Sequence, residues 1–215
     1  QKLTWNPIPL WKEYWKVKPL RGLTALVIPH QFSIAVIFAF LPLFLVENLS
    51  FSIEQVGIIL FVKEIPQLLQ QLAGKLTDQW GSKKVSILGT TLTGIGMIGF
   101  AFASTFEMIL LTAFVYGLGA SILGIGTLAM LSGIGEKQKR EATYLGTHVS
   151  ISKWGAFIAF LVAGIIVETA GMSFLFALAG TLLFWGVIVA EEKMGLHSFP
   201  MPKTKMLVNL LFHHR

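Results

Sequence analysis

The stretch VGIILFVKEIPQLLQQLAGKLTDQWGSKK, residues 56–84, places two adjacent charges, Lys63 and Glu64, inside an apolar run of membrane-spanning length. A helix needs about 20 residues to cross roughly 30 Å of hydrocarbon. A charge at the centre of a bilayer costs roughly 2.5–3.5 kcal/mol, so intramembrane charges usually face a polar interior and serve a function. The stretch therefore predicts a membrane protein with a polar route through it.

The composition of the whole chain agrees with a membrane environment. Of its 215 residues, 54% are hydrophobic and only 13% are charged, whereas a soluble domain carries about 25% charged residues. Cysteine is absent, which excludes disulfides, thiolate metal sites and cysteine nucleophiles.

Six apolar runs of spanning length follow one another. They are continuously apolar and do not alternate, which favours helices over barrel strands. We therefore expect an all-α membrane protein with a six-helix transmembrane bundle at 23–190, a cytoplasmic interfacial segment at 1–22 and a cytoplasmic linker or amphipathic tail at 191–215. The expected spans are Leu23–Val46, Val56–Leu76, Val85–Ala103, Met108–Leu131, Gly146–Val167 and Ser173–Ala190.

The distribution of charge predicts the orientation. If both ends of the chain lie on one side, that side holds every Lys and Arg except Lys63 and Lys153, and the charged residues of the opposite loops are all acidic. The positive-inside rule then places both ends in the cytoplasm. We expect a multi-pass protein of a bacterial plasma membrane, and the basic net charge needs no nucleic-acid partner.

The segments outside the bundle are expected to contact membrane lipids. Trp11 and Trp15 are four residues apart, on one helical face, and Lys12, Lys16 and Lys18 alternate with the aromatic residues of this segment. This pattern is typical of an interfacial helix, serving either as an anchor or as a docking site for a partner. Beyond Pro200 and Pro202, the run Met206–Phe212 is either a second interfacial helix or the first turns of a seventh span.

The second span carries an unusual polar stripe. At 100° per residue its polar side chains fall within an arc of about 120°, and they are Lys63, Glu64, Gln67, Gln70 and Gln71. Adjacent residues do not face each other on a helix, so we expect Lys63 and Glu64 to find separate partners, and Pro66 to kink the span. The stripe is either a polar network that holds helices together or a pathway for a substrate or ion.

Other polar residues inside the spans are candidates for the same site. His30 and Gln31 in the first span could bind a ligand, and His30 could take a proton near neutral pH. Tyr116 could line a cavity, and Lys153 either binds substrate or extends to the inner surface. Glu64 is the carboxylate clearly inside a span, so it is the favoured group for proton coupling.

The glycines indicate helix packing. Residues 94–99 match the dinucleotide pattern G-x-G-x-x-G, but no strand precedes them and the segment is apolar. Close packing through small residues explains them better. The same explanation covers glycines of the fourth span and a stripe in the fifth, namely Gly117, Gly119, Gly124, Gly126, His148, Ser152, Gly155, Ala159 and Ala163. No phosphate loop, nucleophile elbow or zinc-ligand spacing occurs, so we expect no enzyme, cofactor or metal.

The loop after the second span resembles a family signature. The pattern Gly74-x-x-x-Asp78-x-x-Gly81-x-Lys83-Lys84 closely resembles the loop between spans two and three of the major facilitator superfamily. Six spans with both ends inside are similar to one half of such a transporter. The resemblance implies a six-helix bundle that packs against a second, related bundle around a central cavity.

The resemblance also implies roles for the loop residues. Asp78 would pair with basic groups and a helix N-terminus of the facing half, latching the outward-facing state. Gly74 and Gly81 would allow close approach and a tight turn, and Lys83 and Lys84 would anchor the loop inside. Some positions depart from the family, including Gln79 and Ser82 in place of basic residues and Ala113 where many proton-coupled members carry an arginine.

These observations support a leading hypothesis and two alternatives. The leading one is a secondary transporter half, the first half of a twelve-span chain or a stand-alone half that dimerises, moving a small or amphipathic solute by alternating access. Its partner would be a second six-helix half, in the same chain or another copy. The alternatives are a non-transporting scaffold or assembly factor with the same fold, and the membrane domain of a larger fusion protein.

Overall fold

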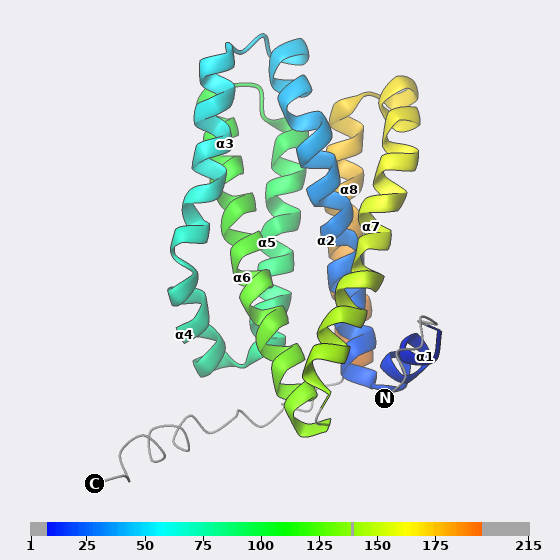
Figure 1. Ribbon diagram of the computed structural model, residues 1–215. Coiled ribbons are helices and arrows are strands. Elements are labelled where there is room, and N and C mark those ends of the chain that lie inside the picture. The colour runs from blue at the N-terminus through cyan, green and yellow to red at the C-terminus, as the bar shows by residue number, and fades with distance from the viewer. Residues whose placement is uncertain (1–7, 139, 195–215) are drawn as a thin grey trace, which may run out of the picture.

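The computed structural model describes residues 8–138 and 140–194, and helices form nearly all of this part of the chain (Figure 1). The first seven residues and residues 195–215, including the expected tail helix Met206–Phe212, lie outside it. The helices in chain order are α1 (Ile8–Lys16), α2 (Lys18–Leu43) continued by one π-helical segment η1 (Phe44–Asn48), α3 (Ile53–Leu68), α4 (Gln70–Trp80), α5 (Ser82–Phe102), α6 (Phe106–Gln138), α7 (Glu141–Ala170) and α8 (Met172–Met194).

The helices have the length and hydropathy of membrane spans. Within the described residues five can cross a membrane singly, and the pair α3 and α4, bent by 46° at a short break, makes a sixth when counted as one span. The expected all-α membrane bundle is confirmed. The helices extend beyond the apolar runs at their ends, as where α2 begins at Lys18.

The bundle has one basic end, at the bottom of Figure 1. The start of α2, the turn between α4 and α5, the turn between α6 and α7 and the end of α8 meet there, and these segments carry Lys18, Arg21, Lys83, Lys84, Arg140 and Lys193. The short turns at the opposite end join η1 to α3, α5 to α6 and α7 to α8. The six-span arrangement thus gathers the basic loops on one side, as the charge pattern requires.

Small residues bring the helices together. A Cβ atom added to Gly96 of α5 would lie 2.7 Å from Tyr116 of α6, one added to Gly94 would lie 3.2 Å from Phe184, and one added to Gly99 would lie 2.9 Å from Thr112. The packing interpretation of residues 94–99 is therefore confirmed. The expectation that Gly124 packs closely against another helix is wrong. Nothing lies within 4 Å of its Cβ position, because that position of α6 faces outward.

Helix α1 is fastened to the bundle by one buried tyrosine. Tyr14 is fully buried, and its hydroxyl lies 3.1 Å from the Thr24 hydroxyl of α2 and 2.7 Å from Nδ1 of His148 of α7. Glu13 adds an exposed ion pair with Arg140. The segment before the first span thus packs against α2 and α7, in addition to any contact with lipid.

We predict that Tyr14→Phe destabilises the protein by about 1–3 kcal/mol, because it leaves buried polar groups without a partner. Thermal unfolding in detergent measures the change, with the more exposed Trp15 replaced by Phe as the matched control. Burial raises the pKa of Tyr14 from 10.0 to about 12, against a smaller lowering by Thr24. The Tyr14 contribution is therefore constant below pH 10 and lost as the pH rises toward 12. Equal stability of Tyr14→Phe and Trp15→Phe would refute this role.

Candidate functional site

The position of α3 is set by its contact with α6. Gly117 has no side chain, and the carbonyl oxygen of Lys63 occupies the space that a Cβ atom would take. One turn along α6, the Ser121 hydroxyl donates a hydrogen bond of 3.2 Å to the Pro66 carbonyl. These two contacts hold the charged segment of α3 against the centre of α6.

The bend of this span begins just after Pro66. Proline has no N–H to continue the helical ladder, and α3 ends two residues later. The Leu69 N–H donates to the Pro66 carbonyl at 3.1 Å, and the Leu72 N–H donates to the Leu69 carbonyl at 2.9 Å. These bonds join residues three apart, as in a tightened 3₁₀ turn, so the expected kink appears as the break between α3 and α4.

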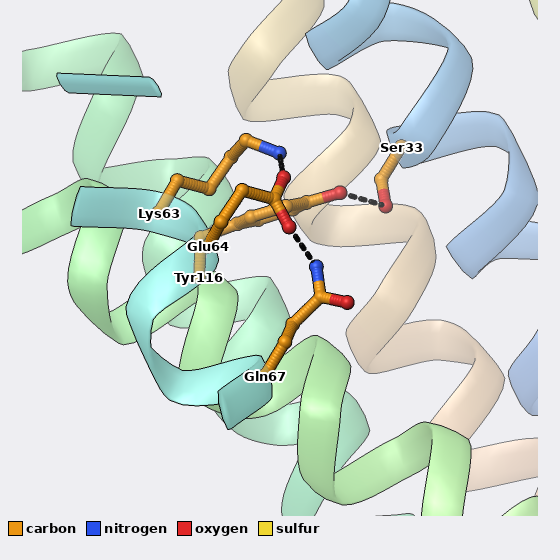
Figure 2. Close-up of polar contacts among 5 residues, drawn as sticks. All are labelled: Ser33, Lys63, Glu64, Gln67 and Tyr116. Atoms are coloured by element: carbon orange, nitrogen blue, oxygen red, sulfur yellow. Dashed lines mark hydrogen bonds and ion pairs between the residues drawn. The ribbon is translucent and has the colours of Figure 1, made fainter. Parts of the chain in front are cut away.

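Lys63, Glu64 and Gln67 form one polar cluster, shown in Figure 2. The Lys63 ammonium forms an ion pair with one oxygen of the Glu64 carboxylate, and the Gln67 amide donates to the other oxygen. The expectation that Lys63 and Glu64 find separate partners is wrong, because the long lysine stem bends across the helix surface. The Lys63 side chain is 18% exposed and the Glu64 side chain 50% exposed.

A second polar pair lies beside the cluster. In Figure 2 the Tyr116 hydroxyl and the Glu64 carboxylate both point toward the side where α2 carries Ser33. The buried Tyr116 hydroxyl lies 3.5 Å from Ser33 Oγ, and Ser33 donates to the His30 carbonyl at 2.8 Å. Ser33 was not among the residues predicted from the sequence; its position one turn after His30 on the same helix was the available signal.

The remaining candidates of the spans lie apart from the cluster. His30 is buried and its Nδ1 atom has no hydrogen-bond partner in the described structure. Gln31 lies beside Gly155 of α7, and Lys153 is exposed on α7. Among the described residues, none of these three side chains bonds to Lys63, Glu64 or Gln67. The expected stripe is also interrupted, since Gln70 and Gln71 belong to α4, beyond the bend.

The loop residues take up the turn between α4 and α5. Gly81 has φ +85° and ψ 146° and ends α4. Its positive φ is costly for other residues, which agrees with the expected tight turn. The spaces beside Gly74 and Gly81 are open, and Asp78 is exposed with no hydrogen bond or ion pair inside the described ranges. Lys84 is exposed, and Lys83 is partly buried. A latch at Asp78 therefore needs groups from outside these residues.

The site has no metal-binding arrangement in the described part of the chain. No group of three His, Asp or Glu side chains there is close enough to share an ion. The arrangement offers one carboxylate, one ammonium, an amide and two hydroxyls. Such a set can bind a polar or charged solute or exchange a proton.

Comparisons with known proteins agree on one family. The model of the Major Facilitator Superfamily matches residues 23–205. The chain is 28% identical over 180 residues to the multi-drug resistance efflux pump PmrA of Streptococcus pneumoniae, covering 81% of this chain and 44% of that protein. It is 30% identical over 95 residues to the methyl viologen resistance protein SmvA of Salmonella typhimurium, covering 44% of this chain and 19% of that protein.

A third relative comes from an animal. The chain is 26% identical over 144 residues to the probable vesicular acetylcholine transporter-A of Danio rerio, covering 66% of this chain and 28% of that protein. The matched stretch is less than half the length of each of these three relatives.

We predict that Gly117→Ala destabilises the bundle by about 1–3 kcal/mol or more, because the new methyl group meets the Lys63 carbonyl and pushes α3 away from α6. Gly124→Ala on the same helix is the matched control, since nothing lies within 4 Å of its Cβ position. The unfolding temperature in detergent should fall for the first variant and stay within a degree or so for the second. A similar response of the two would show that the Gly117 contact does not position α3.

Proposed function

Because this chain belongs to the major facilitator superfamily, we propose that it forms one six-helix half of a secondary active transporter. It is an integral, multi-pass membrane protein, with helices of spanning length and hydropathy. The relatives named as an efflux pump and as a transporter support transport as the activity of the complete protein.

The half-exposed Glu64 carboxylate is the observation that carries this proposal. Glu64 lies 11 residues beyond the start of α3, about 16 Å along the helix, which is near the middle of a 30 Å hydrocarbon layer. A carboxylate at that depth cannot lie against acyl chains without a large cost. A second six-helix half, in the same chain or another copy, would cover this face and enclose a cavity around the cluster.

Alternating access follows from such a cavity. Rocking of the two halves would open the cluster first to one side of the membrane and then to the other. Asp78 and the turn at Gly81 would contact the facing half at the basic end and hold one of the two states. We assign Glu64 to binding the substrate or the coupling proton, with Lys63 and Gln67 holding its carboxylate in place.

The substrate that we propose is a small or amphipathic organic solute. The relatives are named for methyl viologen resistance, multi-drug efflux and acetylcholine transport. The basic end supports an orientation with both ends of the chain in the cytoplasm. Two of the relatives are bacterial, which supports a bacterial plasma membrane.

A non-transporting scaffold would need this polar cluster to be sealed. Lys63 is paired with a neighbour, as such a network requires, but half of the Glu64 side chain is exposed. The Gln67 residue beside it is also exposed. The exposure of the cluster therefore favours transport over a purely structural role.

We predict that Glu64→Gln abolishes gradient-driven uptake by vesicles that contain the complete protein, because the amide neither carries charge nor exchanges a proton. The probe is a panel of fluorescent organic solutes, with an imposed proton or sodium gradient. The matched control is Glu107→Gln in the first turn of α6, at the opposite end from the basic loops, which should keep uptake unchanged. Unchanged gradient-driven uptake in Glu64→Gln would remove Glu64 from the mechanism.

A further inference from the structure

A groove separate from the polar cluster lies between α7 and α8, on the surface of α2. Gly155 of α7 lies against the Ile28 carbonyl, and Gly186 of α8 lies against the Ala25 carbonyl. Both helices are thus pressed onto the same segment of α2 from different sides. Between them remains a groove of about 450 Å³, lined by residues of α1, α2, α7 and α8 and by none of α3 to α6.

The body of the groove is apolar. Ala25, Ile28 and Pro29 form its floor, and Ile158 of α7 and Trp185 of α8 stand along its walls. The side chain of Ile158 is 44% exposed and that of Trp185 is 61% exposed, so the groove opens to the outside of the bundle. Its one hydroxyl, that of Thr24, is already bonded to the Leu20 carbonyl at 2.9 Å and to Tyr14.

The charged groups of the groove lie together at its basic end. Arg21 and Lys193 both line the groove there, beside Trp15. The Arg21 Nε atom donates to the Trp15 carbonyl, which fixes the guanidinium at the rim. Lys193 lies 3.9 Å from Glu192 in an exposed pair, and exposed pairs of this kind are weak. Both cations are therefore available to an anion at the rim.

The groove has the length of one membrane leaflet. It runs along α2 from Arg21 to Phe32, which at 1.5 Å per residue is about 16 Å. Half of a hydrocarbon layer of about 30 Å has nearly the same thickness. The groove begins at the depth of lipid headgroups, where Trp and cationic residues gather, and ends near the middle of the membrane.

We propose that this groove binds one anionic phospholipid of the leaflet at the basic end, independently of the transport function. An acyl chain lies along Ala25, Ile28 and Pro29, and the phosphate is held by Arg21 and Lys193. The charge at one end, the apolar surface behind it and the length of one leaflet select a lipid over a soluble anion. Basic pockets between transmembrane helices on the cytoplasmic side suit anionic headgroups.

Native mass spectrometry of the full chain tests the headgroup preference. The protein in detergent is offered equal amounts of phosphatidylglycerol and phosphatidylcholine with identical acyl chains. We expect phosphatidylglycerol to be retained about tenfold more, from two cations near the membrane surface. The double variant R21Q/K193Q should lose the preference, whereas the exchange R21K/K193R and the control K12Q/K84Q, which changes two exposed cations outside the groove, should keep it.

A groove-filling variant tests the acyl-chain site separately. Val189→Trp places a large ring in the groove and should reduce retention of both lipids severalfold. Ile188→Trp, at a neighbouring position of α8 that is 65% exposed and does not line the groove, should not. Equal retention of the two lipids by the unaltered protein, or a preference that survives R21Q/K193Q, would overturn the proposal. So would a dimer without bound lipid, which would assign the groove to a second copy.

Discussion

The contact between the Lys63 backbone and Gly117 determines where the charges of this bundle lie. It lets α3 approach α6 more closely than any side chain would allow, and it does so at the depth where the span is half crossed. Ser121 adds a hydrogen bond to the Pro66 carbonyl just beyond, so the charged segment contacts α6 at two successive points. The break between α3 and α4 lies just beyond, where the Leu69 N–H donates to the Pro66 carbonyl in a tightened turn.

The six helices alone do not shield the Lys63–Glu64 pair fully from the hydrocarbon of the membrane. Lys63 and Glu64 neutralise each other, and Gln67 occupies the second carboxylate oxygen, which lowers the cost of placing them in a membrane without removing it. The Glu64 carboxylate points toward the side where α2 carries Ser33 (Figure 2), and half of the Glu64 side chain is exposed. We propose that a partner bundle covers that face, whereas the apolar groove of α7 and α8 lies on elements that can remain in contact with lipid.

The sequence was sufficient for those features that are set along the chain. Bilayer thickness dictates the length of each apolar run, so the spans were predictable, and the turn at Gly81 followed from its glycine. Features that join distant segments were not predictable. Tyr14 and His148 are 134 positions apart, and nothing local indicates their contact or that of Tyr116 with Ser33. The Lys63–Glu64 pair was mispredicted because the Cα–Cβ bonds of adjacent helical residues point in different directions. The four-carbon lysine side chain is long enough to bend back and reach the carboxylate of the next residue.

Water access to the polar cluster distinguishes a transport cavity from a sealed polar network. The chain has no cysteine, so Gln67→Cys and Leu68→Cys each introduce one thiol at nearly the same depth of α3, one on the polar face and one on the apolar face. The complete protein in vesicles is treated with a membrane-impermeant thiol reagent, and modification of the α3 segment is measured by mass after proteolysis. We expect rapid labelling at position 67 and little at position 68. Little labelling at both positions, or equal labelling of the two, would contradict this expectation.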